Sequence, residues 1–86
     1  MQTSEPYSSR RLHVVADADP GAIAPVVERL QNLNIVPRRL YTAFSSDDLL
    51  YIEVDVHGVP DEQLALITGK IRQAPCILSA YWHRLD

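Results

Sequence analysis

The chain has 86 residues, which suffices for one domain with a thin hydrophobic core. Apolar residues make up 47% of it and charged residues 22%, a balance that excludes the composition of disordered chains. The formal net charge is −3 without a strongly basic block, which argues against a nucleic-acid partner. Cys76 is the single cysteine and is expected to be a small buried hydrophobe. Because the chain has no second cysteine, it cannot form an internal disulfide, a zinc site built from several cysteines or a Cys-x-x-Cys redox pair.

The N-terminal residues 1–10 are polar and lack the apolar centre of a signal peptide. We expect a flexible tail over 1–10 and a single domain over 11–86. No apolar run approaches the ~18 residues that a membrane-spanning helix needs, and a lone free cysteine suits a reducing compartment. The sequence therefore predicts a cytoplasmic protein without a membrane partner.

The first elements are a strand and a helix. Residues 11–17 alternate in the two-residue period of a strand. Asp19 suits the N-cap of a helix and Pro20 its first position. Apolar side chains then recur at helical spacing, at Ile23, Val26, Val27, Leu30 and Leu33. Pro25 lacks the N–H that a helix interior needs, so we expect an irregular first turn or a bend.

Two strands are expected after this helix. Asn34 lies just past the helix end, where Asn tolerates the left-handed conformation of a C-terminal cap. Residues 35–44 favour strand, but Pro37 permits one only at a sheet edge or a bulge, so we expect an edge strand. Residues 45–48 form a turn, and residues 50–57 then alternate more clearly than any other segment.

A second helix and a last strand complete the chain. Residues 58–61 carry a proline and an acidic side chain that suit a helix start, and Pro75 ends the helix. The inward stripe of this helix consists of Leu64, Ile67, Ile71 and Ala74. Residues 76–84 predict a strand, with one face formed by Cys76, Leu78, Ala80 and Trp82. The order of elements is β-α-β-β-α-β.

This order predicts an α+β fold, the ferredoxin-like βαββαβ sandwich. In it a four-stranded antiparallel sheet carries both helices on one face, because right-handed crossovers place them on the same side. The other face stays uncovered in a single chain, and a partner would dock there or at a sheet edge. Arg38 or Arg39 is expected to pair across the sheet with Glu53 or Asp55.

No catalytic or metal-binding motif is recognisable. His13, His57 and His83 each lie on a predicted strand without a motif around them, and a lone strand histidine is most simply a polar surface residue. Asp17 and Asp19 have no third ligand nearby, and capping alone explains Asp19. There is no phosphate loop and no nucleophile motif. We therefore expect no catalytic residue, no metal site, no cofactor and no enzyme activity.

The segment Asp17-Ala18-Asp19-Pro20-Gly21-Ala22-Ile23, followed by Leu33-Asn34-Ile35, resembles the ACT domain family of amino-acid-responsive regulatory modules. The resemblance covers about residues 11–84. In its short length the chain is most similar to the single-ACT form of the small regulatory subunit of acetolactate synthase. The resemblance implies a homodimeric module of branched-chain amino-acid biosynthesis that activates a larger, thiamine-dependent catalytic subunit and binds an amino acid at the dimer interface.

The resemblance also implies a set of ligand-binding residues: Ala18, Asp19, Gly21, Ala22, Ile23 and Asn34. Gly21 matches the family's turn glycine, and Asn34 matches the Asn that reaches the ligand across the dimer. Backbone N–H groups at a helix start can hold a carboxylate, which agrees with this role. Ala18 departs from the family, whose valine-responsive members carry Asn there, because alanine has no side-chain donor or acceptor. This departure and the negative charge of Asp19 argue against valine binding.

Three other interpretations fit parts of the sequence. The turn at residues 17–21 could simply join a strand tightly to a helix. The domain could be a free-standing sensor of an amino acid or another small molecule. An RNA-binding domain of the same fold would use Tyr51 and Tyr81 as stacking platforms, but Glu53 and Asp55 share their predicted face and disfavour it.

Overall fold

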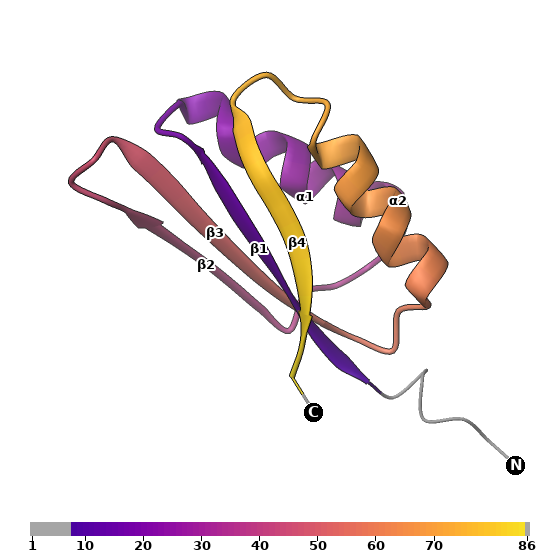
Figure 1. The fold of residues 1–86 in the computed structure, drawn as a ribbon. Coiled ribbons are helices and arrows are strands. Elements are labelled where there is room, and N and C mark those ends of the chain that lie inside the picture. The colour runs from indigo at the N-terminus through magenta and orange to yellow at the C-terminus, as the bar shows by residue number, and fades with distance from the viewer. Residues whose placement is uncertain (1–7, 86) are drawn as a thin grey trace, which may run out of the picture.

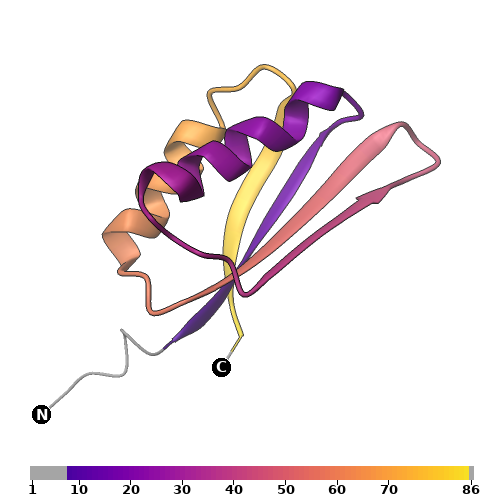
Figure 2. The same ribbon diagram turned by 180° about the vertical axis from the view of Figure 1, so that it is seen from behind.

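The computed structural model describes residues 8–85. The elements are β1 (Ser9–Asp17), a 3-10 turn η2 (Pro20–Ala22), α1 (Ile23–Asn32), β2 (Arg39–Phe44), β3 (Leu49–His57), α2 (Asp61–Ile71) and β4 (Ile77–Arg84). The strands form one antiparallel sheet in the order β2-β3-β1-β4. Both helices cover the same face of this sheet (Figure 1), and the view from behind shows α1 crossing it (Figure 2). The predicted ferredoxin-like fold is confirmed.

The core lies between this sheet face and the helices. Its buried side chains are Leu12, Val14, Val26, Leu30, Ile52, Val54, Val56, Val59, Leu64, Ile67, Ile71 and Ala80. The alternation predicted for the central strands is therefore correct, and so is the inward stripe of Leu64, Ile67 and Ile71 on α2. The helix ends at Ile71 and not at Pro75 as predicted, so half-buried Ala74 lies in the turn that follows it. Trp82 packs against the core and donates its indole N–H to the carbonyl of Leu64 at 2.9 Å, which ties β4 to α2. Within the described range, no helix is long and apolar enough to cross a membrane.

β1 begins at Ser9 rather than at the predicted residue 11, because Ser9 and Arg10 pair with the end of β3. Residues 1–7, the greater part of the predicted tail, lie outside the described residues. Half-buried Cys76 likewise precedes the last strand, which starts at Ile77. These differences shift strand ends only.

The start of α1 has the irregular first turn that Pro25 predicted. Pro20–Ala22 forms a 3-10 turn, and the α-helix starts at Ile23. Pro25 is then the third residue of α1, where a backbone N–H has no partner inside the helix. The missing N–H therefore breaks no helical hydrogen bond, and the helix continues to Asn32.

The end of α1 explains why the next strand is shorter than predicted. Asn34 has a φ of 56°, its N–H donates to the carbonyl of Gln31 at 3.1 Å, and the N–H of Ile35 donates to that of Leu30 at 2.9 Å. These bonds form a Schellman motif, with Asn34 at its left-handed position as predicted. Because Ile35 closes this motif, β2 starts only at Arg39 and not at residue 35.

The prediction that Leu78 shares the face of Ala80 and Trp82 in β4 was wrong. Ala16 lies opposite Ile77 and Val15 opposite Ser79, so Leu78 is an extra residue in a β-bulge. The bulge turns Ile77 toward the core, while the side chain of Leu78 is 55% exposed instead of buried. The edge position predicted for the second strand is confirmed, because β2 lies at one end of the sheet.

Candidate functional site

The turn between β1 and α1 uses its backbone N–H groups internally. The Ala18 N–H donates to the carbonyl of Asp48 at 3.1 Å, which fastens the turn to the β2–β3 hairpin. The Gly21 N–H donates to Oδ1 of Asp19 at 2.7 Å, and the Ala22 N–H donates to the Asp19 carbonyl at 2.9 Å. Asp19 therefore caps the 3-10 turn that leads into α1, whereas Ala22, the N-cap residue of α1 itself, makes no side-chain capping bond. A ligand carboxylate could reach the Gly21 N–H only by displacing the Asp19 side chain.

Gly21 leaves room for this cap. A Cβ atom on residue 21 would lie 3.2 Å from Oδ1 of Asp19, a contact tighter than side chains normally make. The absence of a side chain thus lets a carboxylate approach the backbone closely. In this chain, the carboxylate next to the Gly21 backbone is the side chain of Asp19.

A small hollow lies beside this turn. Its volume is about 280 Å³, and its walls are formed by Ala18, Asp19, Pro20, Ile23, Phe44 and Leu50. The hollow brings together three residues of the predicted ligand set: Ala18, Asp19 and Ile23. Ala22 is instead buried in the core, and Gly21 does not line the hollow.

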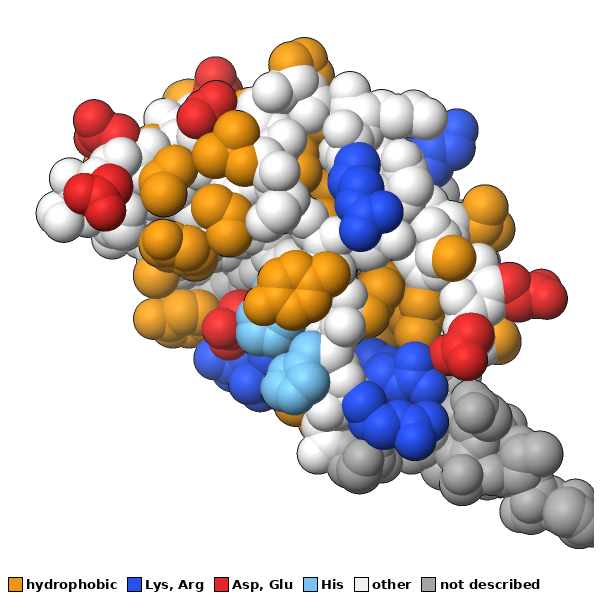
Figure 3. All heavy atoms as spheres, in the orientation of Figure 1, with side chains coloured by type: hydrophobic (Ala, Val, Ile, Leu, Met, Phe, Trp, Pro, Cys, Tyr) orange, Lys and Arg blue, Asp and Glu red, His pale blue; other side chains and the backbone are white. Residues whose placement is uncertain are grey.

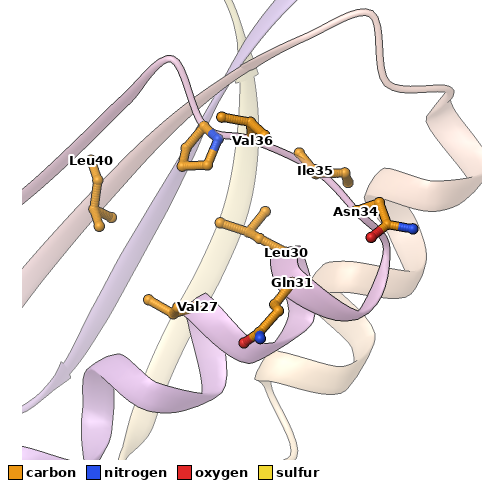
Figure 4. Close-up of a pocket in the computed structure, with 8 residues that line it drawn as sticks. Val27, Leu30, Gln31, Asn34, Ile35, Val36 and Leu40 are labelled. Atoms are coloured by element: carbon orange, nitrogen blue, oxygen red, sulfur yellow. The ribbon is translucent and has the colours of Figure 1, made fainter.

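Asn34, the remaining residue of the predicted set, lies at the opposite end of α1. It borders a larger apolar groove of about 420 Å³ between α1 and β2, lined by Val27, Leu30, Gln31, Asn34, Ile35, Val36, Pro37 and Leu40. In Figure 4, Val27 and Leu30 project from α1 toward the side where Leu40 descends from β2. The groove is within the size range of small-molecule sites, whereas the hollow beside the turn is just below it.

β2 forms a free edge next to both depressions. The Ser45 N–H donates to the Leu49 carbonyl at 2.8 Å, so the backbone groups of this pair face each other. Such pairs alternate with pairs whose groups face away. Leu40, Thr42 and Phe44 therefore direct their N–H and C=O groups to the open edge, where no strand of the described region pairs with them.

The side chains of these three residues lie on the helix face of the sheet. Thr42 is opposite Ile52 and Leu40 is opposite Val54, and both partners belong to the core. The helices do not cover this part of the face, however, since Leu40 is 47% exposed and Phe44 is 65% exposed. Sequence reasoning identified the edge strand but missed its exposed apolar row. The spacing of Leu40 and Phe44 was the available signal.

The open face of the sheet carries a charged network across three strands. Arg11 donates two hydrogen bonds to Asp55, from Nε at 2.7 Å and from Nη2 at 2.9 Å. Arg39 donates to Oε1 of Glu53 at 3.0 Å, which confirms the cross-strand pairing predicted for this arginine. The hydrogen bonds from Arg11 lower the pKa of Asp55, and the charges of Arg11 and Arg39 add to this effect against the opposing influence of burial.

Two histidines meet on the same open face. The ring of His13 stacks on Tyr81 with centroids 4.9 Å apart, and its Nε2 lies 3.4 Å from Nδ1 of His83. These histidines are 70 residues apart in sequence, so nothing local could have joined them. His57 lies elsewhere and contacts the Ser9 hydroxyl at 2.9 Å.

Comparison with known proteins supports the fold only. A scan against protein-family models and a search of curated proteins gave no match. Among solved structures, the C-terminal domain of the MgtC protein from Mycobacterium tuberculosis matches with a TM-score of 0.76 and 17% identity, over 99% of this chain and 95% of that domain.

Two further structures relate the fold to enzymes. The ACT domain from the GTP pyrophosphokinase of Chlorobium tepidum matches with a TM-score of 0.70 and 12% identity, over 90% of this chain and 96% of that one. A homoserine dehydrogenase from Thiobacillus denitrificans matches with a TM-score of 0.76 and 16% identity, over 99% of this chain but only 19% of that enzyme. The chain therefore has an ACT-like fold.

Proposed function

We propose that this chain is a non-catalytic regulatory module that forms a homodimer through β2 and binds a small amino acid between the two copies. Its first candidate target is the larger, thiamine-dependent catalytic subunit of acetolactate synthase. The observation that carries the proposal is the division of the ligand set: the turn lies at the start of α1 and Asn34 at its end. A single chain cannot bring the two parts together.

A second copy can bring them together. The hollow beside the turn includes Phe44 from one end of β2, and the groove beside Asn34 includes Leu40 near the other end. If two β2 strands pair antiparallel around Thr42, Phe44 of one copy lies opposite Leu40 of the other. The turn of one copy then adjoins the Asn34 groove of the second copy, twice in the dimer.

The edge of β2 is suited to this pairing. Its free N–H and C=O groups belong to Leu40, Thr42 and Phe44, so ladder bonds can form without disturbing β3. The same pairing would cover the exposed apolar side chains of Leu40 and Phe44 with their counterparts. Burial of apolar surface provides the driving force, and a domain of this size benefits from the added core.

The solved structures support a regulatory role for such a module. One match is an ACT domain of a GTP pyrophosphokinase, and another is a minor part of a homoserine dehydrogenase chain. The fold thus occurs as a non-dominant part of larger enzymes.

Replacement of Thr42 by proline tests the dimer. Thr42→Pro removes an N–H that β3 does not use, and edge strands accept proline, so the monomer should keep its fold. Thr42→Val is the matched control, because it keeps the N–H and the side-chain shape. Sedimentation equilibrium should give dimers for the wild type and Thr42→Val and monomers for Thr42→Pro. A wild-type monomer at micromolar concentration would contradict the assembly.

Calorimetry against the twenty amino acids tests the ligand. We expect heat with a single small amino acid for the wild type and none for monomeric Thr42→Pro, because each site needs both copies. The catalytic target is tested by co-purification and by adding the chain to a thiamine-dependent synthase. Activation supports a regulatory subunit. Binding of an amino acid without any effect on a synthase supports the alternative, a free-standing sensor.

A further inference from the structure

The two histidines on the open sheet face form a pair that the proposed function does not use. His13 lies on β1 and His83 on the neighbouring strand β4. His13 is opposite Tyr81 and His83 is opposite Arg11, so the two histidines are diagonal neighbours, offset by two residues. Both side chains therefore lie on the same face and lean toward each other across the strands. Figure 3 shows histidine side chains (pale blue) gathered there, beside a hydrophobic side chain and basic groups.

The distance between the ring nitrogens fits a shared metal ion. His13 Nε2 and His83 Nδ1 are 3.4 Å apart, which is longer than the 2.7–3.2 Å of ordinary hydrogen bonds. Two imidazole nitrogens on one tetrahedral zinc ion, each bound at about 2.0–2.1 Å, lie about 3.3–3.4 Å from each other. We propose that His13 and His83 bind a divalent transition-metal ion, with Zn²⁺ as the ion tested.

A carboxylate lies behind the His13 ring, on the side away from His83. Its Nδ1 lies 3.9 Å from Oε2 of Glu53, near enough for a direct or water-bridged contact after a small movement. A proton on Nδ1 would then leave the lone pair of Nε2 directed toward His83. Metal-binding histidines commonly have a carboxylate behind them in this way, because it fixes the tautomer and the ring orientation.

Glu53 and the ring itself are held in place from both sides. Arg39 donates to Glu53 at 3.0 Å, and Tyr81 stacks on the His13 ring at an interplanar angle of 14°. A row of contacts thus runs across all strands, from Arg39 on β2 through Glu53 and His13 to His83 on β4. These contacts limit the movement of the His13 ring.

Solvent can supply the remaining ligands. The side chain of His13 is 24% exposed and His83 is exposed, so the space above the two nitrogens is open to water. Residues 8–85 hold no group of three or more side chains placed to bind a metal, so the protein provides two ligands and water completes the shell. The nearby arginines do not oppose a cation strongly, since Arg11 is paired with Asp55 and Arg39 with Glu53.

Zinc titration of the untagged full-length chain, stripped with chelator, tests the site. Isothermal calorimetry should show one Zn²⁺ per chain, and both His13→Gln and His83→Gln should weaken binding at least tenfold. Glu53→Gln should weaken it by about tenfold, the lower range for loss of a group that supports a ligand. His57→Gln is the matched control and should bind zinc as the wild type does, because His57 contacts the Ser9 hydroxyl and lies on β3, on the other side of β1 from His83.

Circular dichroism of each variant checks that its fold is retained. Thermal unfolding provides a second readout: zinc should raise the Tm of the wild type and of His57→Gln, but not that of His83→Gln. Equal zinc affinity for the wild type and His83→Gln would overturn the site, and so would the absence of binding at millimolar zinc. Monomeric Thr42→Pro should still bind zinc, so this result is independent of the proposed dimer.

Discussion

Removal of the Asp19 side chain should lower stability and raise ligand affinity together. Asp19→Ala deletes the carboxylate that accepts the 2.7 Å hydrogen bond from the Gly21 N–H. Loss of an Asp N-cap lowers helix or protein stability by about 0.5–2 kcal/mol, typically about 1. For a domain of 60–100 residues, about 1 kcal/mol corresponds to a Tm decrease of about 4–8 °C.

The same change frees the site for a ligand. In the wild type, an amino-acid carboxylate must displace the tethered Asp19 carboxylate and also approach its negative charge. A hydrogen bond to a charged group contributes about 1.5–3 kcal/mol, and each 1.4 kcal/mol is a tenfold change in affinity. If the proposed amino-acid site is correct, Asp19→Ala should therefore bind its ligand about tenfold more tightly or better.

Asp19→Asn is the control, because it keeps an oxygen acceptor for the Gly21 N–H and loses only the charge. Differential scanning calorimetry should give a Tm near that of the wild type for Asp19→Asn and a lower one for Asp19→Ala. An unchanged Tm in Asp19→Ala would refute the capping argument. Weaker ligand binding in Asp19→Ala would show that the carboxylate binds the ligand instead of competing with it.

Two further variants separate local roles. Asn34→Gly should keep the wild-type Tm, because glycine adopts the left-handed conformation at φ 56° readily, but should abolish the amino-acid heat in calorimetry if the amide contacts the ligand. Equal loss of Tm and of heat would instead assign Asn34 a purely structural role. The pKa of Asp55 is lowered in the folded chain, chiefly by hydrogen bonds from Arg11. The folded state therefore binds fewer protons there, and the stabilisation is present above the ordinary pKa of 3.8 and is lost as the pH falls through the folded value. In Asp55→Asn, the urea concentration at the unfolding midpoint should therefore fall less steeply with decreasing pH below about pH 4. An unchanged pH dependence would show that Asp55 does not cause it.

The sequence was most informative where a local pattern determined the structure. The alternation over residues 50–57 identified β3, and Asp19 and Pro20 identified the start of the first helix. Pro25 correctly indicated an irregular first turn. Each of these predictions depends on residues only a few positions apart, so the physical cause lies within the segment that carries it.

The sequence was least informative where the cause lay elsewhere in the fold. The face of Leu78 depends on the register between β4 and β1, which no local alternation reveals. The pairing of His13 with His83 needs the sheet order, because β1 and β4 are neighbours only after folding. The apolar surface at the candidate dimer contact could not be predicted from the sequence either, because the exposure of Leu40 depends on which part of β2 the helix α1 leaves uncovered.

The bulge at Leu78 also determines where this fold can change in length. Ile77 lies opposite Ala16 and Ser79 lies opposite Val15, so Leu78 has no opposite residue on β1. A chain without this residue would still direct Ile77 toward the core and His83 toward the open face. Leu78 is therefore a position at which β4 could lose one residue while every other side chain of the strand keeps its face.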